Sequence, residues 1–458
     1  KVYTFHLHDD VYFHDHPKFP QGKGRKVVAQ DFVYSIKRIY DPKTASPGSW
    51  IFNALDKTKS PVALNDTTLK FVLKKPFPGF LGLLSMKYCS VVPKEIVEHY
   101  GNDFGSHPIG TGPFKFKRWK RGEKLVFRKN KNYFEKDSTG HPLPYLDAIA
   151  ISFISDKQSE FLEFIKGEID FLSGLSPANK DELITRTGKL NPKYEDRIRM
   201  ITQPYLNTEY LGFLTDTSLK EVRSSPVSNK LVRQAINYGF DRKKMMKYLR
   251  NNIGTPANQG FIPKGLPAFN PDKVNGYTYQ PDKARDLLKE AGYPGGKGLP
   301  EITLTTTDDY KDICEFIQHQ LGEIGIDISI EVSTGATFRD MVANSKLLFF
   351  RGSWIADYPD AENYLALFYS KNFSPGGPNY THYENKTFDH LYKKALATID
   401  DKKRRGLYQK MDQIIINDAP IVPLYYDQVV RFTHKNVQNL NSNPMNLLTL
   451  KYVKKTHP

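Results

Sequence analysis

The chain has 458 residues, 39% hydrophobic and 13% aromatic, which excludes a disordered polymer and predicts a folded protein of two or three domains. No stretch approaches the roughly 18 consecutive apolar residues that a membrane-spanning helix needs. The net charge of +16 raises nucleic acid or an anionic membrane as partners. The basic residues are scattered in short groups, however, and nucleic-acid binding needs one basic stripe, so we interpret most of them as solvated faces.

The first distinctive stretch is "FHLHDDVYFHDHPKF", which places four histidines and three aspartates between His6 and His16. The alternation of apolar and polar residues predicts a β-hairpin that turns at Asp9-Asp10 and gathers the histidines on one polar face. Imidazole and carboxylate are common ligands of zinc, so a metal site is one interpretation. An ordinary solvated face is the other, and we favour it because a short His-rich tract is only compositional evidence.

Further elements follow along the chain. An apolar stripe at helical spacing predicts a helix over 29–40, and alternation predicts a strand over 69–73. Two alternating strands, 114–119 and 124–128, are joined at Arg121-Gly122 and predict a hairpin. The segment 157–166 reads as a helix that ends at Gly167, a C′ glycine.

The second half of the chain indicates an α/β layer. Asp241 is a predicted N-cap of a helix. The segments 301–307, 311–325 and 326–332 predict a strand, a helix and a strand, which is a βαβ unit with parallel strands. A strand running into a loop is expected over 347–360, and a last long strand over 419–432.

Motifs of catalysis and of metal or disulfide frameworks are missing. The sequence contains no GxSxG, no HExxH and no P-loop, and "GTGPF" at 110–114 is too short and precedes a strand. Cys89 and Cys314 are far apart without CxxC spacing, so we expect two buried thiols. We therefore expect no enzyme and no cofactor.

Eight segments, taken in order, resemble the bacterial extracellular solute-binding proteins of family 5, the receptors of oligopeptide, dipeptide and nickel ABC importers. The segments are "YTFHLHDDVYFHD", "AQDFVYSIKRIYDPKTASP", "GTGPFKFKRWKRGEKLVFRKNKNYF", "FIKGEIDFL", "VRQAINYGFDRKKM", "YQPDKARDLLKEAGYP", "SWIADYPDAENYLALFYS" and "APIVPLYY". In that family the His-Asp pair matched by His14-Asp15 is structural, which lowers the metal interpretation further.

The resemblance implies an α/β fold of the two-lobed, type II-like periplasmic binding protein class with an extra accessory subdomain. Residues 1–108 would form the accessory subdomain, without an N-terminal segment that family members carry. Residues 109–206 would form the first lobe, 207–424 the second lobe, and 425–458 would return to the first lobe. The stretches "PYLNTEY" and "PIVPLYY" would be the two crossings between lobes.

The resemblance also implies a function. A receptor of this kind captures short peptides in the cleft between its lobes and delivers them to an ABC permease with its ATPase subunits. We expect a monomer at the periplasmic or extracytoplasmic face, with a lipid anchor as a further option. Alternatives that stay open are a same-family receptor for a nickel chelate, haem or a sugar, a metal-dependent enzyme built on the histidines, and a binder of nucleic acid or anionic surfaces.

A W-x-x-D stretch in the family holds the ammonium group of the peptide, and Trp354 to Asp357 match it. A buried ammonium needs a paired carboxylate, whereas Asp357 as a turn residue before Tyr358-Pro359 is the alternative. Arg351 lies six residues earlier, about 20 Å along a strand at about 3.3 Å per residue. It is a candidate for the peptide carboxylate, and a solvated strand-end arginine is the alternative.

The remaining candidates surround this stretch or lie at the second crossing. Gly352 and Ser353 would offer backbone groups to the peptide, in the manner of an added strand. Tyr425 and Tyr426 would line the cleft, and Trp354 would either join them or lie in the core.

Overall fold

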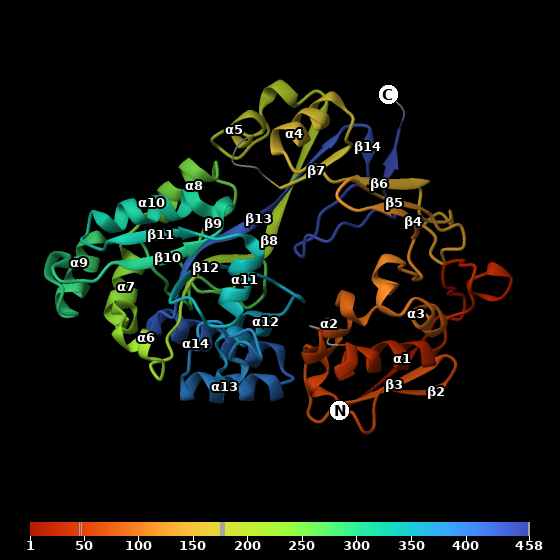
Figure 1. The fold of residues 1–458 in the computed structure, drawn as a ribbon, viewed down its shortest axis with the longest axis horizontal. Helices are drawn as coiled ribbons and strands as arrows, with labels where there is room; N and C mark the ends of the chain where they lie inside the picture. Colours follow the sequence, from red (N-terminus) through yellow and green to blue (C-terminus); the bar gives the residue numbers. More distant parts are fainter. Residues whose placement is uncertain (45, 47, 175–178, 457–458) are drawn as a thin grey trace.

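The computed structural model describes residues 1–44, 46, 48–174 and 179–456. Two long strands, β8 (Ile198–Phe213) and β13 (Ile421–His434), run diagonally through the molecule and connect two α/β bodies, with a third body below the first (Figure 1). They pair antiparallel, from Gly212 opposite Ile421 to Ile198 opposite His434. The two predicted crossings are confirmed as this strand pair. We keep the names first lobe, second lobe and accessory subdomain for the residue ranges given above, whose boundaries stay predictions.

The second lobe is built on a seven-stranded sheet with the order β11-β10-β12-β8-β13-β7, in which β9 also pairs with β13 and the end strand β7 (Phe171–Ser173) comes from the first lobe. Its other strands are β9 (Thr255–Pro256), β10 (Ile302–Thr306), β11 (Ile328–Val332) and β12 (Phe349–Ile355). β10 and β11 are parallel and flank the helix α10 (Lys311–Gly322), which confirms the predicted βαβ unit. β12 pairs antiparallel with β8 over its whole length.

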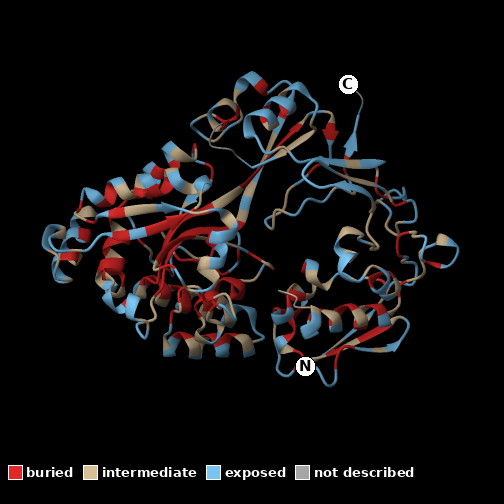
Figure 2. Cartoon of the chain, in the orientation of Figure 1, coloured by how far each residue is buried: buried red, intermediate tan, exposed pale blue. Residues whose placement is uncertain are grey.

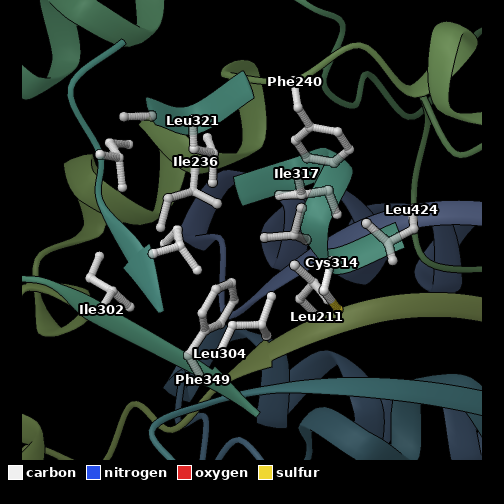
Figure 3. Packing of buried hydrophobic residues seen from close by; sticks show 14 of the residues in the cluster. Leu211, Ile236, Phe240, Ile302, Leu304, Cys314, Ile317, Leu321, Phe349 and Leu424 are labelled. Atoms are coloured by element: carbon white, nitrogen blue, oxygen red, sulfur yellow. The ribbon is translucent and has the colours of Figure 1, made fainter. Parts of the chain in front are cut away.

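Helices cover both faces of this sheet. They are α6 (Lys220–Ser224), α7 (Lys230–Tyr238), α8 (Arg242–Leu249), α9 (Pro281–Glu290), α11 (Gly335–Ala343), α12 (Glu362–Leu365), α13 (Lys386–Ala397) and α14 (Asp401–Asp418). Asp241 caps α8 as predicted, because its carboxylate accepts hydrogen bonds from the amides of Lys243 and Lys244. Ile236, Ile317 and Phe349 are among the side chains that fill the core between α7, α10 and the strands (Figure 3). Most of the buried residues lie in this lobe (Figure 2).

The first lobe is smaller than the second, and it contains fewer buried residues. It contains β4 (Phe114–Lys120), β5 (Lys124–Lys129), β6 (Ala148–Ser152), β7 (Phe171–Ser173), β14 (Val437–Gln438), β15 (Lys454–Lys455), α4 (Lys157–Lys166) and α5 (Lys180–Leu183). β4 and β5 form the predicted hairpin. Gly167 ends α4 with a left-handed φ of 86°, as expected for a C′ glycine.

The accessory subdomain has a three-stranded sheet with α1 (Ala29–Ile39), α2 (Phe80–Leu84) and α3 (Lys94–Tyr100). The strand order is β1 (Val2–His6), β3 (Thr68–Val72), β2 (Val62–Asn65). The predicted hairpin across Asp9-Asp10 is wrong, because β1 pairs with β3 and residues 11–16 form no strand beside it. Phe5 packs edge-on against Phe71, so the long-range contact replaces the local one.

The histidines of the first stretch therefore separate. The His14 ring is buried, with Nε2 2.8 Å from the Gly112 carbonyl oxygen, and His16 Nε2 lies 3.1 Å from the Tyr100 hydroxyl. His6 and His8 are exposed. Within the described residues, no group of three or more histidine, cysteine, aspartate or glutamate side chains is arranged to hold a metal ion.

The two cysteines are free thiols, Cys314 buried and Cys89 half-buried, and burial raises the pKa of each to about 11. None of the helices that the structure describes is both long and apolar enough to cross a bilayer. The chain thus has a two-lobed α/β fold with an accessory subdomain, as predicted.

Candidate ligand-binding cleft

The W-x-x-D stretch spans the end of β12 and the start of the loop that follows, and one buried amide holds it in place. Asp357 lies two residues beyond the end of β12, and its backbone N–H donates to Asn363 Oδ1 at 2.9 Å. The Trp354 indole N–H donates to the same oxygen at 3.0 Å. Asn363 Nδ2 in turn donates to Asp357 Oδ2 at 3.2 Å. Asn363, which sequence reasoning missed, therefore fixes both the loop and the direction of the carboxylate.

The Asp357 carboxylate is half-buried, and the loss of solvation raises its pKa, against the opposing effects of the Asn363 amide and the Lys87 charge. Within the part of the chain that the structure describes, no cationic side chain comes within ion-pair distance of it. A desolvated carboxylate without a counter-ion gains free energy when a cationic group is placed beside it. This position can accept an ammonium group.

Arg351 is buried, so the alternative interpretation, a solvated arginine at the end of a strand, is wrong. Its side chain is 10% exposed and forms an ion pair with Glu209 on β8. Its guanidinium carbon lies 3.2 Å from the centre of the Tyr310 ring, and its Nε has no hydrogen-bond partner among the described residues. Burial raises the pKa of Glu209, and the charge of Arg351 opposes that rise.

The ion pair belongs to a larger charged network at the crossing of the lobes. Asn207 Nδ2 donates to Glu209 Oε1 at 2.9 Å and to Asp427 Oδ2 at 3.3 Å, so it bridges the two acids. Arg250, the C-cap residue of α8, donates to Asp427 Oδ1 at 3.3 Å. Two arginines thus balance two carboxylates. Apart from Arg351, the members of this network (Glu209, Asn207, Asp427 and Arg250) were not predicted as site residues.

A cavity of about 280 Å³ opens beside this network. It lies between α4, β7 and α5 of the first lobe and α8 and α10 of the second lobe, and Tyr310 forms part of its wall. Its charged lining consists of Lys157, Glu160, Lys180, Arg250, Asp309 and Asp312. Arg250 is the more accessible arginine of the network, with 22% of its side chain exposed. The cavity can therefore accommodate a charged or zwitterionic group.

The other predicted site residues have separate places. Gly352 lies opposite Tyr210, and a Cβ on it would come 2.5 Å from the Tyr210 ring, so the strand pair requires glycine here. Ser353 is half-buried opposite Glu209, and Trp354 is half-buried against the second-lobe core.

Tyr425 and Tyr426 differ from the expectation that they line the cleft. Each is 1% exposed, and neither belongs to the wall of the cavity. Tyr425 packs under Arg250, whose guanidinium carbon is 5.2 Å from the ring centre, and the Tyr426 hydroxyl donates to the Gly260 carbonyl oxygen at 2.7 Å. Both rings support the crossing from within the core.

Comparison with known proteins gives relatives that are named as binding proteins. The chain is 28% identical over 440 residues to the heme-binding protein A of Haemophilus influenzae, which covers 92% of this chain and 75% of that protein. It is 27% identical to the dipeptide-binding protein DppE of Bacillus subtilis, with 99% of this chain and 81% of that protein covered.

Among solved structures, the periplasmic binding protein DppA of Helicobacter pylori in complex with the peptide STSA superimposes with a TM-score of 0.82 at 27% identity. That match covers 99% of this chain and 86% of the other. The family described as bacterial extracellular solute-binding proteins, family 5 Middle, matches residues 1–376. The chain therefore belongs to the bacterial extracellular solute-binding proteins of family 5.

Proposed function

We propose that this protein is the substrate-binding receptor of an ABC importer and that it captures short peptides between its lobes. The observation that carries the proposal is the half-buried carboxylate of Asp357, two residues beyond the end of β12. Asn363 orients it, and it has no ion-pair partner among the described residues. The α-ammonium group of a peptide supplies the missing positive charge. Pairing offsets the cost of removing both charges from water.

The open edge of β12 supports an extended ligand. On the side of β10, strand pairing is restricted to Phe350 opposite Thr305, so the segment from Arg351 toward Asp357 has no strand partner there among the residues that the structure describes. A peptide that lies along this edge can form main-chain hydrogen bonds as an added strand. Main-chain contacts are independent of peptide sequence, so we expect broad specificity.

The charged cavity suits the other end of such a ligand. Arg250 and Lys180 line it, and a peptide carboxylate can form charge-assisted hydrogen bonds with either. Both arginines are ion-paired, but Arg351 is a weaker candidate for the carboxylate than its position on β12 suggested, because it is less exposed than Arg250 and does not line the cavity. The proposal thus assigns the two peptide termini to two differently charged places.

The relatives support the class of ligand and leave its chemistry open. One is named for dipeptides, and the solved structure from Helicobacter pylori holds a peptide. A relative 26% identical, from Shigella flexneri, is named a glutathione-binding protein. Glutathione also carries an ammonium group and a terminal carboxylate, although a second carboxylate lies beside its ammonium group. Because the heme-binding relative is equally similar in sequence, a non-peptide ligand is the second candidate. Partners would be a permease and its ATPase subunits at the extracytoplasmic face, with the receptor a monomer that is free or lipid-anchored.

Calorimetric titration with three probes tests the proposal: trialanine, reduced glutathione and haem. A receptor for peptides should bind trialanine, with a Kd near or below the micromolar range. Binding of haem with no heat from trialanine would contradict the peptide assignment and favour the second candidate.

A further inference from the structure

Tyr358, the residue after the ammonium anchor, belongs to the second lobe in sequence but packs in the core of the accessory subdomain. It is 3% exposed and lies in one cluster with Phe71, Phe80 and Leu83. The approach to α2 is close, because a Cβ on Gly82 would come 2.9 Å from Tyr358 Cβ and 3.1 Å from its ring. α2 lies at the side of the accessory subdomain that faces the second lobe (Figure 1).

The polar end of Tyr358 is tied to the second lobe. Its hydroxyl donates to one carboxylate oxygen of Glu362, and the Tyr392 hydroxyl donates to the other. Glu362 is 6% exposed, so this trio is internal. Tyr358 therefore has its hydroxyl end fixed in one body and its ring and Cβ fixed against another, immediately beside Asp357.

The residues of α2 agree with a docking role for this helix. Phe80 and Leu83 face the accessory core, and Leu81 is 54% exposed. Gly82 occupies the position that faces Tyr358. A glycine inside a helix costs about 1 kcal/mol relative to alanine, and here the close approach of the tyrosine accounts for it.

We propose that the accessory subdomain is a latch for the ammonium end of the ligand site, closed by the contact between Gly82 of α2 and Tyr358. The contact bridges segments that are far apart in sequence, and one of them directly follows the anchor. Lys87, three residues beyond the end of α2, also opposes the rise in the pKa of Asp357 through its charge. Opening the site at this end requires α2 to leave Tyr358. The role in ligand retention depends on the proposed function, whereas the docking contact does not.

The first test is a cross-link that needs no ligand. Cysteines at Gly82 and Tyr358 have the Cβ proximity that a disulfide requires after a small adjustment. In a Cys89→Ser background, Gly82→Cys/Tyr358→Cys should form an intramolecular disulfide under mild oxidation. The matched pair Leu81→Cys/Tyr358→Cys should not, because Leu81 faces solvent. Failure of the Gly82 pair to cross-link, or equal cross-linking of both pairs, overturns the latch whatever the ligand.

The second test measures retention of trialanine by Gly82→Leu, with Leu81→Ala as the control on the same helix. The leucine cannot fit against Tyr358, so the dissociation rate should rise about tenfold or more, as expected when a closed state loses population. Gly82→Ala, a smaller intrusion, should show the same direction and covers the case in which the leucine variant fails to fold. Unchanged dissociation in both variants would overturn the latch. A cross-link that forms in a protein that does not bind trialanine would overturn the proposed function and the ligand role together, and would leave the docking contact standing.

Discussion

Glu209 on β8 and Arg351 on β12 form a buried ion pair at the crossing of the two lobes, with the Tyr310 ring 3.2 Å from the guanidinium carbon. Asn207 donates to both Glu209 and Asp427, and Asp427 also accepts a hydrogen bond from Arg250. The charged groups at this end of the candidate site are therefore paired with one another. Asp357, at the other end, has no ion-pair partner among residues 1–44, 46, 48–174 and 179–456.

Removal of one member of the buried pair should destabilise the protein. Arg351→Leu leaves the Glu209 charge buried without its partner, which costs about 3–5 kcal/mol in the free energy of unfolding. The double variant Glu209→Leu/Arg351→Leu leaves no uncompensated charge at these positions and should lose less. Urea unfolding of the three proteins measures the difference. A double variant less stable than Arg351→Leu would show that the pair itself, and not the burial of an unpaired charge, is what matters.

Arg250 should contribute to ligand affinity in addition to its ion pair with Asp427. Arg250→Gln removes a charge-assisted hydrogen bond to the peptide carboxylate, so the Kd for trialanine should rise about 10- to 100-fold. Lys247→Gln, on the exposed face of the same helix, is the control and should bind normally. Trialanine amide, which lacks the carboxylate, should bind both variants alike. If Arg250→Gln weakened the binding of trialanine and of trialanine amide equally, Arg250 would shape the cavity and would not bind the peptide carboxylate.

Stability should depend on pH through Glu362. Burial raises its pKa in the folded protein to about 7, above the value of 4.5 expected for an unfolded chain. The folded state therefore holds the proton of Glu362 more tightly than the unfolded state does. The contribution of this proton to the free energy of unfolding is complete below about pH 4.5 and is lost as the pH rises toward 7. The loss is up to about 3 kcal/mol. Glu362→Gln cannot titrate, and its unfolding free energy should fall less over this interval. Parallel curves for both proteins from pH 4.5 to 8 would contradict the assignment.

Sequence patterns predicted the elements whose contacts are local. The apolar stripe of α1, the β4–β5 hairpin, the βαβ unit and the Asp241 cap all depend on residues close together in the chain. The hairpin expected at Asp9-Asp10 failed because β1 pairs with a strand more than 60 residues away. Local alternation carries no information on that distant partner.

The site was predictable in part for the same reason. The W-x-x-D loop is contiguous, so the motif located Asp357, and Asn363 is only six residues away. The charged network joins Asn207, Arg250, Arg351 and Asp427, which come from four distant segments and meet only in the fold. Tyr425 and Tyr426 were assigned to the cleft because they lie at a crossing, but alternation along a buried central strand does not reveal which face is open.

The central claim is that Asp357 holds the ammonium group of a peptide, and a two-by-two comparison tests it most directly. Trialanine and N-acetyl-trialanine are titrated by calorimetry into the wild type and into Asp357→Asn, which keeps the shape of the side chain. Acetylation removes the positive charge and the substitution removes the negative one. Each change alone disrupts a buried charge pair, at a cost of about 3–5 kcal/mol, or about two to four decades in affinity.

Because both changes disrupt the same pair, their effects should not add. The acetylated peptide should bind the wild type and Asp357→Asn with similar, weak affinity, and free trialanine should be the only one of the two peptides that is strongly sensitive to the substitution. Equal affinity of the wild type for free and acetylated trialanine, or additive losses in the two-by-two comparison, would contradict the assignment of Asp357 as the ammonium anchor.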